Sequence, residues 1–283
     1  MADSNAVPAS KARFSDLRTR LISAGALGAV ALACLWFGGF WTGALAALAG
    51  GVMMAEWRAI TAAHVDEEPV RSGALYIFAV GWAPLAHYVR GVEIAVFGLV
   101  AMGIYGLVLD IRRGQRAQGF WAFVGVSYIG LAALALVELR GVEPYGFLSI
   151  LWAGLVVIAA DVGGYFAGKT IGGPKLWPAI SPKKTWSGTI GGVVLAFLVG
   201  GLFSWATTGT YFMQVCAVSV IAAVLAQAGD LGESALKRRF GVKDAGSILP
   251  GHGGVLDRLD GHIAALLVVA AVTFWRGEAV FIW

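Results

Sequence analysis

The chain has 283 residues, of which 58% are hydrophobic and only 13% are charged, and its mean hydropathy is +0.76. This composition excludes an ordinary soluble domain or a disordered chain, and it is typical of a protein that lives in a bilayer. The net charge of +4 could suggest a nucleic-acid partner, but the cations are scattered over short loops, so we predict none.

Apolar segments follow one another along nearly the whole chain. A membrane span needs roughly 20 apolar residues to cross a hydrocarbon core of about 30 Å. About nine segments qualify, near residues 21–37, 40–56, 74–89, 92–110, 120–138, 146–167, 188–206, 211–229 and 261–282. The sequence therefore predicts an all-α integral membrane protein, a polytopic bundle of about nine transmembrane helices. Cys34 and Cys216 fall inside these segments, where they behave as small apolar residues.

Residues 1–20 form a polar N-terminal tail whose basic residues precede the first apolar run, 21–37, as they would in a signal peptide. No A-x-A-like cleavage site is obvious, and another apolar segment follows immediately. We interpret the run as a retained first span.

The basic residues indicate which side of the membrane each loop faces. With nine spans and a cytoplasmic N-terminus, 18 of the 21 Lys and Arg residues fall in cytoplasmic segments. Only Arg90, Arg140 and Arg276 fall outside. We therefore expect a cytoplasmic N-terminus.

The longest polar loops of the second half, 168–187 and 229–260, face the cytoplasm in this arrangement, and the first half has no comparable polar cluster. We divide the chain into N-terminal transmembrane helices, 21–140, and a C-terminal catalytic region, 141–283, with its polar site at the cytoplasmic face.

Asp161 lies in or near the end of the sixth apolar segment, where an ionised carboxylate is costly unless it is paired or bound to a cation. It could simply be a helix-end carboxylate that reaches water. The glycines that follow, Gly163, Gly164 and Gly168, would let a ligand or another backbone approach closely, which favours a site.

The motif "ISPKKTWSG" places Ser181, Lys183, Lys184 and Thr185 just before the seventh segment. An N-cap and a cytoplasmic positive charge would explain these residues by themselves. Next to a loop rich in carboxylates, the lysines also suit phosphate oxygens, which they would bind as point charges.

The motif "GDLGESALKRR" resembles a helix start, with Asp230 as N-cap and Glu233 at capping-box spacing. This capping role could by itself explain why Asp230 is present. However, Asp230, Ser234 and Lys237 have i, i+4, i+7 spacing, which aligns a carboxylate, a hydroxyl and an ammonium on one helix face.

The motif "LPGHGGVLDRLDGH" surrounds His252 with glycines and then places Asp257 and Asp260 at the start of the last segment. A purely structural interpretation is a loop that carries a solvated histidine and leads into a capped helix. The alternative is that Gly253 and Gly254 let backbone N–H groups converge on an anion.

Together these residues suit phosphoryl chemistry, in which catalysis consists largely of positioning and charge neutralisation. Aspartate oxygens, with few histidines and no cysteine among them, favour Mg²⁺ over zinc or copper. The chain has no Walker A motif and no kinase glycine loop, so it is not one of the common soluble nucleotide binders.

The chain resembles the phosphatidate cytidylyltransferases, also called CDP-diacylglycerol synthases, over residues 150–265. The matching positions are Ser234, Leu236, Lys237, Arg238, Lys243, Asp244, Gly246, Leu249, Pro250, His252, Gly253, Gly254, Val255, Asp257, Arg258, Leu259 and Asp260. The motif "SPKKTW" at 181–186 and the segment around Asp161 are also similar. The fixed gaps make this resemblance highly specific.

The resemblance implies that CTP and phosphatidic acid react to give CDP-diacylglycerol and pyrophosphate at the cytoplasmic face of the cell inner (plasma) membrane. It implies Mg²⁺ or Mn²⁺ as cofactor, leaves room for a second cation such as K⁺, and is compatible with a homodimer. Asp230 and Asp257 would be the principal cation ligands, with Asp260 and Asp161 supporting them.

The resemblance also implies roles for the other polar residues. The phosphate-binding cations would be Lys237, Arg238, Lys243 and Arg258; His252 would donate a hydrogen bond or organise its loop; and the substrate contacts would include Ser181, Lys183, Lys184, Thr185, Ser234, Asp244, Gly253 and Gly254.

Two alternatives stay open at this point. A CTP-dependent lipid kinase would transfer the γ-phosphate instead of the CMP unit. A polytopic transporter would need polar residues spread through several spans, and few charges lie inside the apolar segments apart from Asp161.

Overall fold

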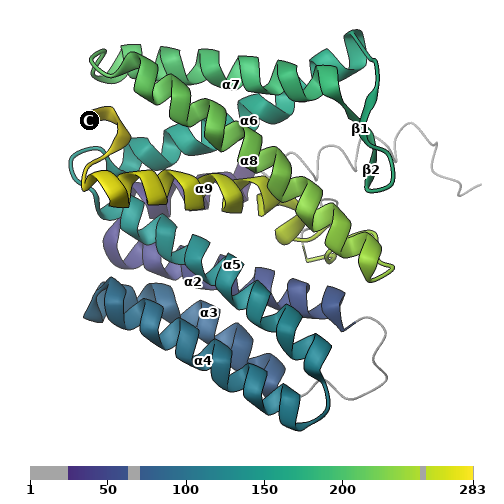
Figure 1. The fold of residues 1–283 in the computed structure, drawn as a ribbon. Coiled ribbons are helices and arrows are strands. Elements are labelled where there is room, and N and C mark those ends of the chain that lie inside the picture. Colours follow the sequence, from purple (N-terminus) through teal and green to yellow (C-terminus); the bar gives the residue numbers. More distant parts are fainter. Residues whose placement is uncertain (1–24, 63–70, 249–252, 283) are drawn as a thin grey trace, which may run out of the picture.

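The structure is a computed structural model that describes residues 25–62, 71–248 and 253–282, and these ranges are almost entirely helical (Figure 1). An apolar helix, Gly25–Phe37, comes first. It is followed by α2 (Gly39–Thr61), α3 (Arg71–Arg90), α4 (Val92–Arg112), α5 (Arg116–Gly141), α6 (Gly146–Thr170), α7 (Trp186–Thr207), α8 (Phe212–Arg239) and α9 (Leu256–Arg276). An antiparallel hairpin of β1 (Lys175–Trp177) and β2 (Ser181–Thr185) joins α6 to α7, and a turn of 3-10 helix, η1 (Val280–Ile282), follows α9.

The described helices have the length and surface of membrane spans. Six of them, α4 to α9, are long and apolar enough to cross a bilayer. Large apolar side chains such as Phe97, Leu198, Trp205 and Phe274 face outward, which suits contact with hydrocarbon and would promote aggregation in water. The chain is therefore a multi-pass membrane protein of the all-α class, apart from the small hairpin, which the sequence did not predict. The number of about nine spans stays a prediction.

The helices form two packed groups that meet along α5 and α9 (Figure 1). The first group, α2 to α5, encloses a core that contains Met54 and Ile129 and that extends to Leu256 at the start of α9. The second group is built from α6, α8, α9 and η1 around Trp152 and Phe281, and α7 packs against α6 and α8. The start of α9 is thus in contact with both groups.

Glycines allow α6 and α7 to pack backbone to backbone. A Cβ atom added at Gly163 would lie 2.6 Å from the carbonyl oxygen of Gly191, and one added at Gly188 would lie 2.8 Å from that of Gly164. Small residues at such spacing are typical of closely packed membrane helices, because they let two backbones approach. This packing holds the C-terminal end of α6 against the N-terminal end of α7.

The predicted site residues that the structure describes gather at one end of the bundle, which we call the polar end. The C-terminal ends of α2, α6 and α8, the N-terminal ends of α7 and α9, and the hairpin all lie there, on the right in Figure 1. At the opposite end Arg140 donates hydrogen bonds from Nε and Nη2 to the carbonyl oxygens of Leu35 (2.6 Å) and Trp36 (3.0 Å), which fastens the first described helix to α5.

Two predicted polar loops are shorter than expected. The segment 168–187 contains the end of α6, the hairpin and the start of α7, and the segment 229–260 contains the last turns of α8 and the first turn of α9. Asp230 therefore lies well inside α8, and the interpretation of Asp230 and Glu233 as a capping box is wrong.

Candidate functional site

The first polar cluster joins α6, β2 and α8. Lys184 Nζ, on β2, lies 2.6 Å from Asp230 Oδ2, on α8, and Ser234 Oγ donates to Asp230 Oδ1 at 3.4 Å. Asp161, on α6, interacts electrostatically with both Asp230 and Lys184. We call Asp161, Lys184, Asp230 and Ser234 the Asp230 cluster. Its two carboxylates repel each other, and Lys184 offsets part of that repulsion.

The position of Lys184 is set by the start of α7, because Thr185, the next residue and the last of β2, is the N-cap of that helix. Thr185 is the N-cap of α7, and its Oγ1 accepts a hydrogen bond from the backbone N–H of Gly188 at 3.1 Å. Next to this cap lies a cavity of about 340 Å³ whose polar lining includes Asp161, Lys183 and Lys184. Lys183, Lys184 and Thr185 of β2 thus line the same space as Asp161 of α6, whereas Ser181, at the start of β2, does not.

The second polar cluster is centred on Asp257 in the first turn of α9. Lys237 Nζ lies 2.7 Å from Asp257 Oδ1 and 2.9 Å from Glu233 Oε2. The backbone N–H of Ala245 donates to both carboxylate oxygens of Asp257, at 3.1 and 3.0 Å, and that of Gly254 donates to Oδ2 at 3.0 Å. Asp257 therefore joins the loop between α8 and α9 to Lys237 of α8. We call Glu233, Lys237 and Asp257 the Asp257 cluster.

Glu56, on α2, caps the N-terminus of α9 from the other half of the molecule. Its side chain accepts the backbone N–H groups of Val255 (3.0 Å) and Leu256 (2.7 Å), and the residue is 3% exposed. A carboxylate at this position accepts hydrogen bonds from N–H groups that have no partner within the helix, and its negative charge interacts favourably with the positive end of the helix dipole. Gly246 and Gly254 pack so closely on it that an added Cβ would lie 2.8 to 2.9 Å from its side-chain atoms.

Asp260 lies between the two clusters. Its carboxylate interacts electrostatically with Asp230 and with Glu233, and Oδ1 accepts the backbone N–H of Gly261 at 2.7 Å. It also lines a cavity of about 590 Å³ together with Trp57, Trp121, Tyr128, Glu233 and Arg239. Both halves of the chain therefore contribute walls to this second polar cavity.

The predicted cation ligands fit Mg²⁺ in chemical type, since all four are carboxylates and hard oxygen donors suit this ion. They are divided between the clusters, and in the described part of the chain no three acidic, histidine or cysteine side chains stand grouped as a metal site. Asp230 has the best position for a ligand because it interacts electrostatically with both Asp161 and Asp260. Asp257 is less available, since Lys237 and two backbone N–H groups already occupy its oxygens.

Other predicted site residues lie further from these contacts. Arg238, Lys243, Asp244 and Arg258 are exposed at the polar end. Gly253 has a φ of 83°, a backbone conformation that residues with a Cβ atom rarely adopt. His252 lies outside the described residues, so its predicted role is not addressed by the structure.

The sequence interpretation missed Glu56 and the pairing of Glu233 with Lys237. Glu56 stands at the end of an apolar run, and an ionisable residue there is a functional hypothesis by default, as it was for Asp161. No sequence signal places it against α9, since it is separated from Leu256 by 200 positions. Glu233 was assigned to a helix cap and therefore not considered as an ion-pair partner.

Comparisons with known proteins agree on one family. The model of the family described as "Cytidylyltransferase family" matches residues 18–275. A phosphatidate cytidylyltransferase of Brucella suis is 38% identical over 252 residues, which is 89% of this chain and 91% of the relative. Those of Helicobacter pylori strain 26695 (35% over 216 residues, 75% of this chain and 78% of the relative) and Bacillus subtilis (38% over 172 residues, 60% and 64%) are also similar.

Proposed function

The chain belongs to the cytidylyltransferase family, and from that premise we propose that it is a phosphatidate cytidylyltransferase. It transfers CMP from CTP to phosphatidic acid, which gives CDP-diacylglycerol and pyrophosphate for phospholipid synthesis. The structural observation that carries the proposal is the meeting of carboxylates and lysines from α6, β2, α8 and α9 at one end of a bundle of apolar helices.

The reaction needs relief of charge repulsion more than it needs a strong base. A phosphate monoester is already largely ionised at neutral pH, so phosphatidic acid can attack the α-phosphate of CTP without a general base. Lys183 and Lys184 line the cavity beside Asp161 and are suited to bind phosphate oxygens there. Lys237 lies between two carboxylates and is suited to bind a phosphate when one arrives.

We further propose Mg²⁺ or Mn²⁺ as cofactor, which Asp230, Asp161 and Asp260 would hold; Asp257 would be a further ligand if Lys237 bound a phosphate instead of this carboxylate. Such an ion would neutralise charge on the triphosphate and on the leaving pyrophosphate. Lys184 Nζ, 2.6 Å from Asp230 Oδ2, holds this carboxylate next to the 340 Å³ cavity that Lys184 itself lines. A second cation, such as K⁺, stays a prediction, and so does a homodimer.

We propose the cell inner membrane as location, with the polar end in the cytoplasm where CTP is available. The basic residues support this orientation, because Arg90, Arg140 and Arg276 lie at or near the helix ends opposite the hairpin, while Lys183, Lys184 and most others lie at the polar end.

Purified protein incubated with CTP, phosphatidic acid and Mg²⁺ tests the proposal, with pyrophosphate and CDP-diacylglycerol as the measured products. CTP labelled at the α-phosphate should place its label in the lipid. A lipid kinase would leave that label in free CDP. Label found in CDP would therefore contradict cytidylyl transfer and indicate phosphoryl transfer. The names of the relatives favour cytidylyl transfer.

A further inference from the structure

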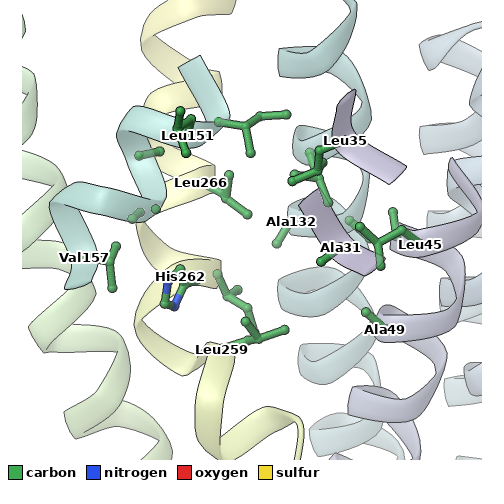
Figure 2. A pocket seen from close by; sticks show the side chains of 18 of the residues that line it. Ala31, Leu35, Leu45, Ala49, Ala132, Leu151, Val157, Leu259, His262 and Leu266 are labelled. Carbon is green, nitrogen blue, oxygen red and sulfur yellow. The ribbon is translucent and has the colours of Figure 1, made fainter. Parts of the chain in front are cut away.

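A third cavity lies away from the polar clusters, deeper between the two helix groups. It measures about 330 Å³, within the roughly 300–1,000 Å³ of small-molecule sites. Its walls come from the helix Gly25–Phe37, α2, α5, α6 and α9 (Figure 2). Figure 2 shows Leu35 and Leu45 facing Leu151 and Leu266 across this space.

The lining of this cavity is apolar with one exception. Among the described residues His262 is the one titratable side chain in the lining, and its ring forms a hydrogen bond to the backbone of Arg258. A polar or charged ligand would have almost no partners here, whereas a hydrocarbon chain would need none. The chemical class of the occupant is therefore an alkyl chain.

The cavity begins one helical turn from the carboxylates of the polar end. On α6 the lining ends at Ile158, three residues before Asp161, and on α9 it includes Leu259 and His262, which flank Asp260 in sequence. A lipid whose phosphate lay at the depth of Asp161 and Asp260 would therefore have its nearest methylene groups at this entrance.

The depth of the cavity suits one acyl chain. Its lining on α6 runs from Phe147 to Ile158, which corresponds to about 16 Å along a helix axis. One leaflet of a bilayer is about 15 Å deep, half of a hydrocarbon core of about 30 Å. Leu32, Leu155 and Ile158 line the cavity and are 48%, 37% and 53% exposed, so the cavity opens sideways to the lipid.

We infer that this cavity holds one acyl chain of the lipid substrate while its phosphate lies at the polar end, an inference that rests on the proposed function. Lipid tails are as apolar as the lining, so the cavity adds little affinity by the hydrophobic effect. Its contribution is to fix where the chain runs, and hence the depth and direction at which the phosphate meets CTP.

Gly154 offers a way to fill the cavity without disturbing the fold. It lines the cavity, and an added Cβ would meet no atom within 4 Å. Gly154 lies seven residues before Asp161, about 10 Å along the helix, so a long chain passes it and a short chain ends before it. Gly28→Leu is the matched control, since Gly28 also has open space around it, lies on an exposed helix face and is absent from the lining.

The experiment compares kcat/KM for dipalmitoyl and dihexanoyl phosphatidic acid in wild type, Gly154→Leu and Gly28→Leu. In Gly154→Leu we expect about a tenfold fall for the dipalmitoyl substrate, the scale of overfilling a packed apolar space, with the dihexanoyl rate nearly unchanged. Gly28→Leu should match wild type on both substrates. An unchanged ratio between the two substrates in Gly154→Leu would overturn the acyl-chain site.

A measurement on unmodified protein makes the result independent of any variant. Phosphatidic acid that carries a diazirine midway along one acyl chain is photolysed with wild-type protein, and labelled peptides are mapped by mass spectrometry. Labelling of α6 near Leu151 and of α9 near Leu266, suppressed by excess dipalmitoyl phosphatidic acid, supports the site. Labelling confined to outward-facing residues overturns it. Failure of the proposed function would look different, since wild type would then convert neither substrate.

Discussion

At the scale of single residues, the short contact between Lys184 and Asp230 is the feature most exposed to test. Asp230 interacts electrostatically with the carboxylates of two other helices and accepts from Ser234. Asp230→Asn should lower kcat/KM for CDP-diacylglycerol formation at least about a hundredfold, the scale seen when one charge-stabilising group is removed from an active site. Protein yield and tryptophan fluorescence should stay near wild type, because the substitution preserves shape.

Glu93→Gln is the control, since Glu93 is an exposed carboxylate in the first turn of α4, at the opposite end of the bundle. It should leave kcat/KM unchanged. Equal activity of Asp230→Asn and wild type would remove Asp230 from the reaction.

Glu56 permits a second test at this scale. Glu56→Gln places an amide NH₂ group against one of two backbone N–H groups that now share a carboxylate, so one buried donor loses its acceptor. We expect the free energy of unfolding to fall by roughly 1–3 kcal/mol, measured as a lower midpoint of thermal unfolding in detergent. Glu56→Asp keeps the charge on a shorter side chain, so its midpoint of thermal unfolding should lie between those of wild type and Glu56→Gln.

If α9 and its preceding loop are positioned by this contact, kcat should fall in Glu56→Gln while KM for CTP changes little. A variant with wild-type unfolding and wild-type kcat would show that the cap contributes nothing.

The sequence singles out candidate residues, but it does not give their partners. Asp161, Lys184, Asp230 and Asp257 stand out as candidates because charge is scarce in this chain and each lies in or beside an apolar run; their roles stay predictions. Their pairing depends on contacts between distant segments, such as Lys184 with Asp230 across α7 and most of α8. A residue such as Glu56 is recognised only when the fold shows what it touches.

At the scale of elements, the close packing of α6 on α7 determines where Lys184 lies relative to Asp161. Gly163→Ala would bring a Cβ to 2.6 Å from the carbonyl oxygen of Gly191 and 2.9 Å from Leu195, so the two helices must separate. We expect a loss of roughly 1–3 kcal/mol in unfolding free energy and a clear loss of activity.

Gly51→Ala, on α2, is the matched substitution, because its added Cβ would meet its nearest neighbour, Ile77, at an ordinary 3.9 Å. It should be neutral in thermal unfolding and in turnover. Neutral behaviour of Gly163→Ala as well would mean that the α6–α7 contact tolerates separation.

Helix positions were predictable from long apolar runs, but the end of α8 was placed too early, at residue 229, for a physical reason. Gly229 and Asp230 resemble the start of a helix, because both residues are unfavourable inside helices and aspartate is a preferred N-cap. In the structure Gly229 instead lets α9 approach, since an added Cβ would lie 2.8 Å from the carbonyl oxygen of Asp260. Packing between helices outweighs the local preference, and α8 continues to Arg239.

At the scale of the whole molecule, the proposed orientation makes a direct prediction. In a background with Cys34 and Cys216 replaced by alanine, Lys175→Cys should react with a membrane-impermeant thiol reagent in inverted vesicles only. Arg90→Cys should react in right-side-out vesicles only, because it lies at the opposite end of the bundle. The reverse pattern would place the polar end outside the cell and contradict a site supplied with cytoplasmic CTP.

The contact between Glu56 and α9 also bears on how the protein is made. The carboxylate of Glu56 emerges from the ribosome about 200 residues before the amides of Val255 and Leu256 that it holds. During translation α2 must therefore wait in the membrane until α9 is made. An mRNA truncated before that point would yield a product that keeps membrane-spanning helices but lacks α9, and it could not complete the place where the two reactants meet.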